Sequence, residues 1–448
     1  MEFGVKWEAV GNDAPEFYET MARLSFTVNG NCLTRNEDIW SRTIKDDVLV
    51  SMYPLATWFA SFWWRLLHEP HPGNGVRPSV SWRMAHELSA ANHGFVWPTI
   101  MFATDGEGIQ VWSSSSNQNA GQSVRYLSGL SSPYFVPMLD FRTEASRFIG
   151  AVLDRLRDSN IADSELSDLW GIVCEEEASP DHNRRRRFEA MMGYDPEECP
   201  ESLLQGMVNL TGTVGESSLS ELMAALATGK AFQDEQEKEI KHFSSLSGLD
   251  GKPDIPQHVF VGSETARRAP WELAVQDANN MRGYFGTKLS ERITNESLYD
   301  VLGISSAAAD RYKPENRSKV SVAVPTQHNQ IRFMPRKKHP TAKRFEYARL
   351  LADCVFQKNH GDGWLVSSDL STFRQKYQRA FAAELLCPIE GVKELMQGDY
   401  SESAIEDASE YFGVSTTTVT SLLTNNHLIE SGFSSSGNGA WPYSPMVA

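Results

Sequence analysis

Three stretches near the end of the chain carry most of the information about its fold: RFEYARLLADCVF (Arg344–Phe356), FAAELLCPIEGV (Phe381–Val392) and AIEDASEYFGVSTTTVTSLLTNNHLI (Ala404–Ile429). The last stretch fits two helices joined by a tight turn, with Gly413 at the turn and Val419 and Leu422 as apolar anchors. We expect all three to belong to one C-terminal domain, residues 320–430.

Together these stretches resemble the ImmA/IrrE family of zinc metallo-endopeptidases. That family carries a helix of the pattern R-F-x-x-A-H-E-x-x-H, a second helix reading E-A-N-x-F-A-A-x-L-L-M-P, and a closing segment A-x-x-F-x-V-S-x-x-x-V-x-x-R-L. The order and approximate spacing of the three patterns are present here, and FAAELLCP is the most specific block. The resemblance covers roughly the last third of the chain. It implies a helical, zincin-like domain.

The residues that bind and use zinc in that family are replaced in this chain. In the family two histidines and a glutamate of the second helix hold the metal, while the motif glutamate polarises water. Arg349 and Asp353 take the histidine positions, Leu350 that of the motif glutamate, and Tyr377 that of the third ligand. Leucine cannot transfer a proton, and one carboxylate is not a zinc site. The resemblance therefore implies a degenerate motif with no catalytic residue, metal or cofactor; zinc enters only under the alternative of a rearranged site.

Two hypotheses remain open for the replaced positions. Arg349 and Asp353 are one helical turn apart, so their side chains can meet, and the pair would then take the place of the metal. Alternatively both side chains are exposed and contribute little. Glu384 falls on a variable position of the family pattern, so we do not expect it to act as a catalytic acid.

A basic strip lies beside these positions. Ile331–Arg349 contains seven Lys or Arg residues and one Glu. We expect a binding strip formed by Arg332, Arg336, Lys337, Lys338, Lys343 and Arg344. It would receive an acidic segment of a protein partner or of the same chain, and pairing with the acidic C-terminal region is the simplest explanation.

DNA binding is the less favoured reading of the closing helix pair. A helix that reads DNA needs Arg, Lys, Asn or Gln facing the groove. Ser415–Thr424 contains no basic residue, and Ile389–Ala448 contains one Lys against eight acidic residues. Because such a surface repels phosphate, we expect the pair to close the domain or to contact protein.

The whole composition is that of a globular, acidic protein. The 448 residues include 42 Lys and Arg against 58 Asp and Glu, a net charge of −16, and 41% are hydrophobic. These values exclude a wholly disordered or collagen-like chain and a basic protein that coats nucleic acid. The length exceeds one ordinary domain.

The expected compartment is the cytoplasm. The first residues, MEFGVKWEAV, do not read as a secretory leader, and five scattered cysteines without a CxxC motif are typical of cytosolic proteins. The longest apolar stretch, Leu55–Leu67, contains Arg65 and is too short to span a bilayer. We therefore expect no membrane contact and a protein partner, with nucleic acid as the less favoured partner; the oligomeric state stays open.

Upstream of the C-terminal domain we predict a tryptophan-rich α/β domain (1–160), a helical middle domain (161–250) and a helical connector (251–319), with a flexible tail at 431–448. Eight of the twelve tryptophans lie in the first 112 residues. The predicted elements are a strand at Met21–Val28, helices at Val50–His68, Trp82–Gly94 and Phe141–Leu156, a hairpin turning at Asp105-Gly106, and a linker at Ser244–Gln257.

Two further features receive structural interpretations. His86-Glu87 lacks the second histidine of a zincin helix, because position 90 is Ala. Arg184–Arg187 is expected to form a solvated helix face, paired with Glu189 or Asp181.

The sequence therefore predicts a multidomain α+β protein, predominantly helical. Its expected role is that of a catalytically degenerate, non-enzymatic regulatory or protein-interaction factor. The resemblance places such a factor in a phage-defence or mobile-element context, because family members cleave transcriptional repressors. One alternative is a zinc metallo-endopeptidase with a rearranged metal site that cleaves a regulatory protein. A second is a helix-turn-helix DNA-binding regulator.

Overall fold

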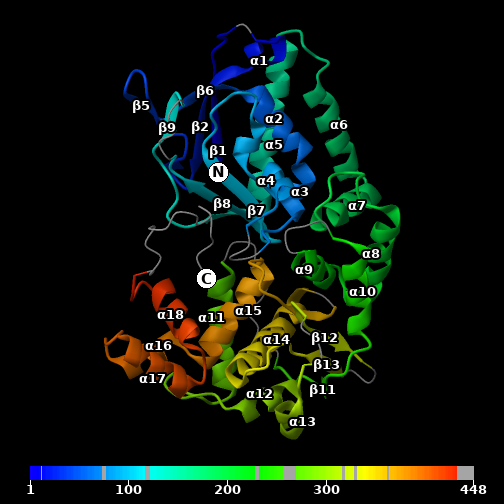
Figure 1. The fold of residues 1–448 in the computed structure, drawn as a ribbon, viewed down its shortest axis with the longest axis vertical. Helices are drawn as coiled ribbons and strands as arrows, with labels where there is room; N and C mark the ends of the chain where they lie inside the picture. The colour runs from blue at the N-terminus through cyan, green and yellow to red at the C-terminus, as the bar shows by residue number, and fades with distance from the viewer. Residues whose placement is uncertain are drawn as a thin grey trace. The chain divides into compact units, whose positions relative to one another are not determined.

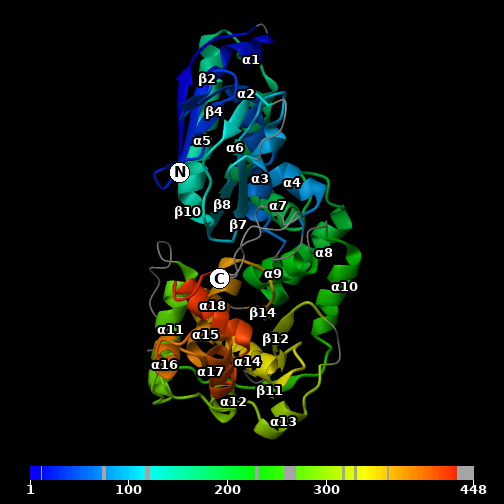
Figure 2. The same cartoon turned by 60° about the vertical axis from the view of Figure 1, so that its left-hand side comes forward.

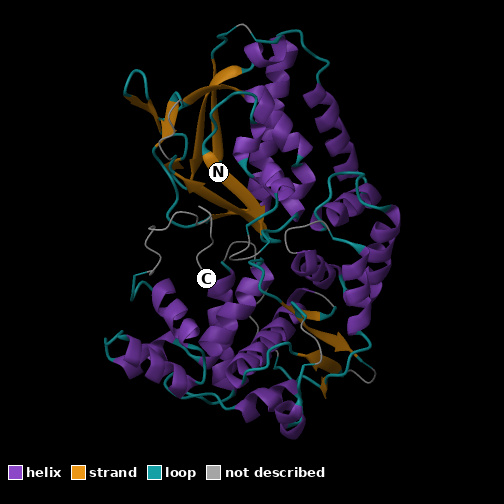
Figure 3. Ribbon diagram, in the orientation of Figure 1, coloured by secondary structure: helices purple, strands orange, loops and turns teal. Residues whose placement is uncertain are grey.

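The computed structural model describes residues 1–11, 13–72, 77–116, 122–227, 232–256, 269–314, 318–326, 330–360 and 363–430. They form two compact units, one of Met1–Pro200 and one that begins at Glu201. Both units combine helices with small antiparallel sheets, which confirms a mixed α+β class (Figure 3). The five predicted domain ranges stay predictions.

The described residues of unit 1 form three sheets. The first is β1 (Glu2–Trp7), β2 (Met21–Val28), β3 (Asn31–Cys32) and β6 (Val48–Ser51); the second is β7 (Thr99–Thr104), β8 (Gly108–Ser114) and β10 (Tyr134–Pro137); the third is β4 (Asn36–Asp38), β5 (Thr43–Lys45) and β9 (Val124–Tyr126). In β2 the buried side chains of Leu24, Phe26 and Val28 alternate with partly exposed ones, as expected of a strand with one face in the core. The predicted strand is confirmed.

Some helices of unit 1 pack directly on these sheets, and others pack on the outer side of those helices (Figure 1). The described helices are α1 (Pro15–Glu19), α2 (Met52–Ser61), α3 (Trp63–His68), α4 (Val80–His86), the 3-10 helix η1 (Leu88–Ala91), α5 (Met138–Asp158), α6 (Glu165–Ala178) and α7 (Pro180–Met191). Trp58, Trp63 and Trp64 are all at most 4% exposed. The early tryptophans of these helices are therefore core residues.

Two predicted helices of unit 1 were wrong in their bounds. Val50 and Ser51 belong to β6, where Val50 lies opposite Ala22 of β2, so ladder pairing outweighs the helical pattern. The predicted Trp82–Gly94 helix ends at His86, because Glu87 has an extended backbone, with φ of −93° and ψ of 122°, and pairs with Met101 in a β-bridge.

The hairpin and the Phe141–Leu156 helix are confirmed. β7 and β8 pair up to Thr104 and Ile109, and the Asp105 carboxylate accepts hydrogen bonds from the Glu107 and Gly108 amides. A short acidic side chain thus satisfies the amides of the turn. The predicted helix lies inside α5.

The described residues of unit 2 form a four-stranded sheet. Its strands lie in the order β11 (Leu249–Gly251), β13 (Ile331–Met334), β12 (Ser321–Pro325), β14 (Leu365–Ser367). The helices of this unit are α8 (Glu201–Val214), α9 (Glu216–Ala227), α10 (Asp234–Phe243), α11 (Pro270–Tyr284), α12 (Asn295–Leu302), α13 (Ser306–Arg311), α14 (Pro340–His360), α15 (Phe373–Leu386), α16 (Ile389–Met396), α17 (Glu402–Phe412) and α18 (Thr416–Asn425). β11 falls inside the predicted linker Ser244–Gln257, which is corrected to a segment that contributes a strand; Gln257 lies outside the described residues.

The core of unit 2 lies between one face of the sheet and the helices α11, α14 and α15, which pack together (Figures 1 and 2). On that face Ala323, Phe333 and Leu365 point into the core. The closing helices α17 and α18 are joined at Gly413, whose φ of +68° suits glycine, and Val419 is fully buried. The predicted helix pair is confirmed, whereas the tail at 431–448 lies outside the described residues.

Among the residues that the structure describes, none of the helices is both long enough and apolar enough to cross a membrane.

Candidate functional site

The three degenerate motif positions on α14 all lie inside unit 2. Arg349 is 3% exposed, and Leu350 and Asp353 are 0% exposed. The helix is buried on every side from Glu346 to Phe356, because the sheet and α15 both pack against it. The hypothesis that Arg349 and Asp353 are exposed surface residues is therefore wrong.

Asp353 pairs with an arginine that the sequence analysis did not single out. Arg374, in the first turn of α15, donates from Nε to Oδ1 and from Nη2 to Oδ2 of Asp353, both at 2.7 Å. The backbone amide of Val366 in β14 also donates to Oδ2, at 2.7 Å. The Asp353 carboxylate thus joins α14 to α15 through a bidentate ion pair, the strongest geometry for these groups, and to β14 through the amide of Val366.

Arg374 is held on its other side as well. Its Nη1 group donates to the Ser218 hydroxyl at 3.1 Å, and its Nη2 group donates to the Trp364 carbonyl at 3.1 Å. Burial lowers the pKa of Arg374, but the charge of Asp353 and its hydrogen bonds outweigh burial and raise the pKa overall. Arg374 is therefore a fixed, permanent cation.

Arg349 forms a second polar cluster beside this pair. Its Nη2 group donates to the Ser368 carbonyl and to Gln375 Oε1, the latter at 2.7 Å. Gln375 in turn donates to the Val366 carbonyl at 2.9 Å, as Gln378 does at 2.8 Å. The predicted ion pair between Arg349 and Asp353 is corrected: both side chains are engaged, but with α15 and β14, because the carboxylate lies closer to Arg374.

Glu221 of α9 is the second carboxylate near Arg374. It is 7% exposed, and among the described residues its Oε2 atom has no hydrogen-bond partner. Burial raises the pKa of Glu221, against the lowering effect of Arg374. Glu221 is therefore protonated more readily than an ordinary glutamate.

Tyr377 lies away from the cluster that Asp353 forms. Its hydroxyl donates to Asp277 Oδ2 of α11 at 2.6 Å, and burial, followed by the charge of Asp277, raises the pKa of Tyr377 well above its ordinary value. Glu384, near the end of α15, accepts a hydrogen bond from the amide of Ile389, the first residue of α16. Burial raises the pKa of Glu384. Among the described residues neither side chain forms a hydrogen bond with Asp353, so the predicted ligand positions do not converge as a metal-binding set.

The predicted basic strip is divided among separate contacts. Arg332 pairs with Asp250 at 2.9 Å, and Arg336 pairs with Asp369 at 2.5 Å. Lys343 donates to two backbone carbonyls of the α13 region, and Arg344, only 4% exposed, bonds Asn295. The acidic partners of Arg332 and Arg336 are therefore Asp250 and Asp369 rather than carboxylates of the described residues 389–430, and Arg344 does not contribute to a surface.

Of the remaining strip residues, Lys337 is half-buried and Lys338 is exposed. Their role as a binding surface stays a prediction.

Unit 1 contains its own buried ionic cluster. On α3 Arg65 pairs with Glu69 one turn later at 2.7 Å, and Glu69 Oε2 also lies 3.1 Å from His86 Nε2. The other nitrogen of His86 lies 2.9 Å from the Phe102 carbonyl, and Trp82 stacks on the ring at 4.0 Å. His86 is thus a hydrogen-bonded core residue.

The four arginines of α7 differ from the predicted solvated face. Arg186 is 6% exposed and pairs with Glu176 and Glu189, each at 2.7 Å. The predicted partner Glu189 is confirmed, but the pairing is internal.

Zinc does not fit the degenerate motif of unit 2. Asp353 already accepts three hydrogen bonds, and the guanidinium groups of Arg374 and Arg349 would repel a divalent cation. Within the described ranges, no three His, Cys, Asp or Glu side chains lie close enough together to hold a metal ion. A comparison with protein-family models, with curated proteins and with solved structures gives no match.

Proposed function

We propose that this chain is a catalytically degenerate ImmA/IrrE-like protein that acts as a non-enzymatic regulatory or protein-interaction factor. The observation that carries the proposal is the Asp353–Arg374 pair. Hydrolysis by a zincin needs a metal and a general base on one helix, and the corresponding positions here are an arginine, a leucine and an ion-paired aspartate. The proposed role is recognition of a regulatory protein without cleavage, in a phage-defence or mobile-element context.

The order of elements in unit 2 supports the resemblance on which the proposal rests. The degenerate motif lies on α14, directly after the β12–β13 hairpin, and β14 leads to α15, which carries the FAAELLCP block. The helix pair α17–α18 follows, as the closing segment of the family pattern would. A polar cluster that ties these elements together preserves the domain without the metal.

Metal analysis of the full chain tests the proposal. We expect purified protein to contain far less than one zinc per chain and to show no chelator-sensitive peptidase activity. The Asp353→Ala variant is compared with Asp369→Ala, which removes a carboxylate that is 72% exposed. Stoichiometric zinc, lost together with peptidase activity in the first variant and kept in the second, would establish the rearranged metallopeptidase instead.

Duplex binding tests the helix-turn-helix alternative. The exposed N-terminal turn of α18 contains threonines rather than cations. We expect no binding of duplex DNA at low salt by fluorescence anisotropy. Binding that weakens steeply as salt rises would favour the DNA-binding regulator.

A further inference from the structure

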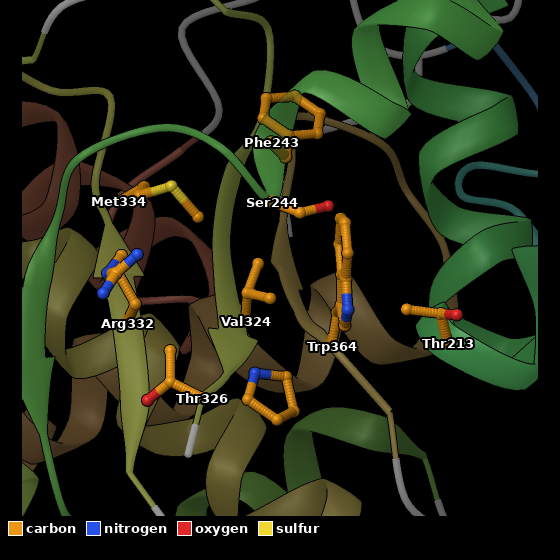
Figure 4. Close-up of a pocket in the computed structure, with 9 residues that line it drawn as sticks. Thr213, Phe243, Ser244, Val324, Thr326, Arg332, Met334 and Trp364 are labelled. Carbon is orange, nitrogen blue, oxygen red and sulfur yellow. The ribbon is translucent and has the colours of Figure 1, made fainter.

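Unit 2 contains a pocket on the face of its sheet that points away from the core. The pocket has a volume of about 320 Å³ and lies between β12, β13 and the ends of α8 and α10 (Figure 4). Sites for small organic ligands have volumes of about 300–1,000 Å³ and mostly apolar walls with a few polar groups. This volume suits a ligand of one or two rings.

The strand register explains which side chains form the floor. Val324 of β12 lies directly opposite Arg332 of β13, and Met334 follows Arg332 on the same face. Ala323 and Phe333, the alternate residues, point into the hydrophobic core. The floor therefore combines two apolar side chains with one cation (Figure 4).

Two aromatic side chains complete the pocket, and the backbone of one of them is firmly held. Phe243 at the end of α10 and Trp364 before β14 line the pocket. The Trp364 amide donates to the Val214 carbonyl at 2.8 Å, and the Trp364 carbonyl accepts from Arg374 Nη2 at 3.1 Å. The backbone of Trp364 is thus fixed by α8 and by the same arginine that neutralises Asp353.

The polar groups of the pocket select the charge of a ligand. Arg332 uses its Nε group to bond Asp250 at 2.9 Å, which leaves the two Nη groups to contact an anion. The hydroxyl groups of Thr213, Ser244 and Thr326 line the same space. Aromatic walls with one guanidinium and three hydroxyls suit a flat apolar ring that carries an acidic group.

We propose that this pocket binds a small planar aromatic anion, a carboxylate or sulfonate, between Trp364 and Phe243 with its acidic group on Arg332. This site is separate from the degenerate motif and does not depend on the proposed function. Because the Trp364 carbonyl contacts Arg374, a bound ligand would also stabilise the polar cluster around Asp353.

The experiment uses the full chain and two probes, 1-anilinonaphthalene-8-sulfonate and its uncharged analogue N-phenyl-1-naphthylamine, with binding followed by probe fluorescence. Arg332→Gln is expected to weaken the sulfonate at least about tenfold, the scale of one lost charged hydrogen bond, and the uncharged probe less than about twofold. Arg157→Gln is the matched control, since it removes the same charge from a side chain that is 63% exposed in unit 1.

A filling variant, Val324→Phe, is expected to weaken both probes. Asp250→Asn, which frees Arg332 from its partner, is expected to tighten the sulfonate probe. Thermal unfolding of each variant shows whether it is folded, because a partly unfolded chain also binds these dyes. Equal binding of the sulfonate by the parent chain, Arg332→Gln and Val324→Phe would overturn the proposal, as would binding by unfolded chain only.

Discussion

Both units bury an arginine against a carboxylate, but they connect the pair to the fold in different ways. In unit 1 Arg65 of α3 pairs with Glu69, the residue that follows this helix, and Asp195 gives the arginine a second acidic partner at 3.2 Å. In unit 2 Asp353 and Arg374 come from different helices, and each also binds the strand segment between them. The first pair joins residues four positions apart and also links α3 to His86 of α4 and to Asp195, whereas the second joins two helices distant in sequence and the strand between them.

From this comparison we expect that breaking the Asp353–Arg374 pair lowers the free energy of unfolding more than breaking the Arg65–Glu69 pair. Asp353→Ala leaves Arg374 buried without its charge partner, which costs about 3–5 kcal/mol of unfolding free energy. Urea midpoints for unit 2 are read by pulse labelling of the buried cysteines Cys354 and Cys387, located by mass spectrometry. Glu390→Ala, which breaks the exposed pair with Lys393, is the control and is expected to cost at most about 0.5 kcal/mol.

Replacing both Asp353 and Arg374 separates the effect of the buried charge from that of the hydrogen bonds to the strand. Apolar side chains of similar volume remove the uncompensated charge, so Asp353→Leu combined with Arg374→Met is expected to recover at least half of the loss seen in Asp353→Ala. The amide of Val366 loses its acceptor in both variants, so recovery is not expected to be complete. If the double variant unfolds as easily as Asp353→Ala, the hydrogen bonds to the strand, and not the buried charge, dominate.

This difference also explains what the sequence could predict. The spacing of Arg65 and Glu69 is visible in the chain, and so are the alternation in Met21–Val28 and the turn at Asp105-Gly106, because local patterns determine them. Asp353 and Arg374 are brought together by β14 folding between two helices, and no spacing rule finds such a partner. One sign was present: Arg374 lies in the first turn of a helix, where a cation opposes the helix dipole and needs a specific partner. The three-residue strand β11 was missed for the same reason, since its pairing with β13 alone defines it.

Glu69→Gln in unit 1 is expected to have a smaller effect than Asp353→Ala. The amide still accepts a hydrogen bond, and Arg65 keeps Asp195, so the expected loss is about 1.5–3 kcal/mol, the value of a hydrogen bond to a charged group. The urea midpoint of unit 1 is read by labelling of the buried Cys199. A loss as large as that of Asp353→Ala would show that a pair between residues four positions apart stabilises its unit as much as a pair between two distant helices.

The smallest expected effect is a pH dependence of opposite sign in the two units. Burial lowers the pKa of His86 below 6.5, against the effect of Glu69, and the pKa of Glu69 is below 4.5 because His86 and Arg65 outweigh its burial. Both groups therefore stabilise unit 1 at pH values above the pKa values of the unfolded chain. As pH falls, the unfolded chain takes up a proton before the folded chain does, first near pH 6.5 at the histidine and then near pH 4.5 at the glutamate, and unit 1 loses stability.

In unit 2 burial raises the pKa of Glu221 and of Glu384 above 4.5, so their protonation favours the folded state as pH falls towards that value. Between pH 7 and 5 the urea midpoint of unit 1 should therefore fall relative to that of unit 2. The corresponding loss of unfolding free energy is up to about 1.4 kcal/mol for each unit by which a pKa differs between the folded and unfolded chain. His86→Gln should reduce the onset near pH 6.5 in unit 1 and leave unit 2 unchanged; the remainder of that onset comes from His68, whose pKa burial lowers to about 3. Parallel pH profiles in the two units would show that these buried groups do not govern their stabilities.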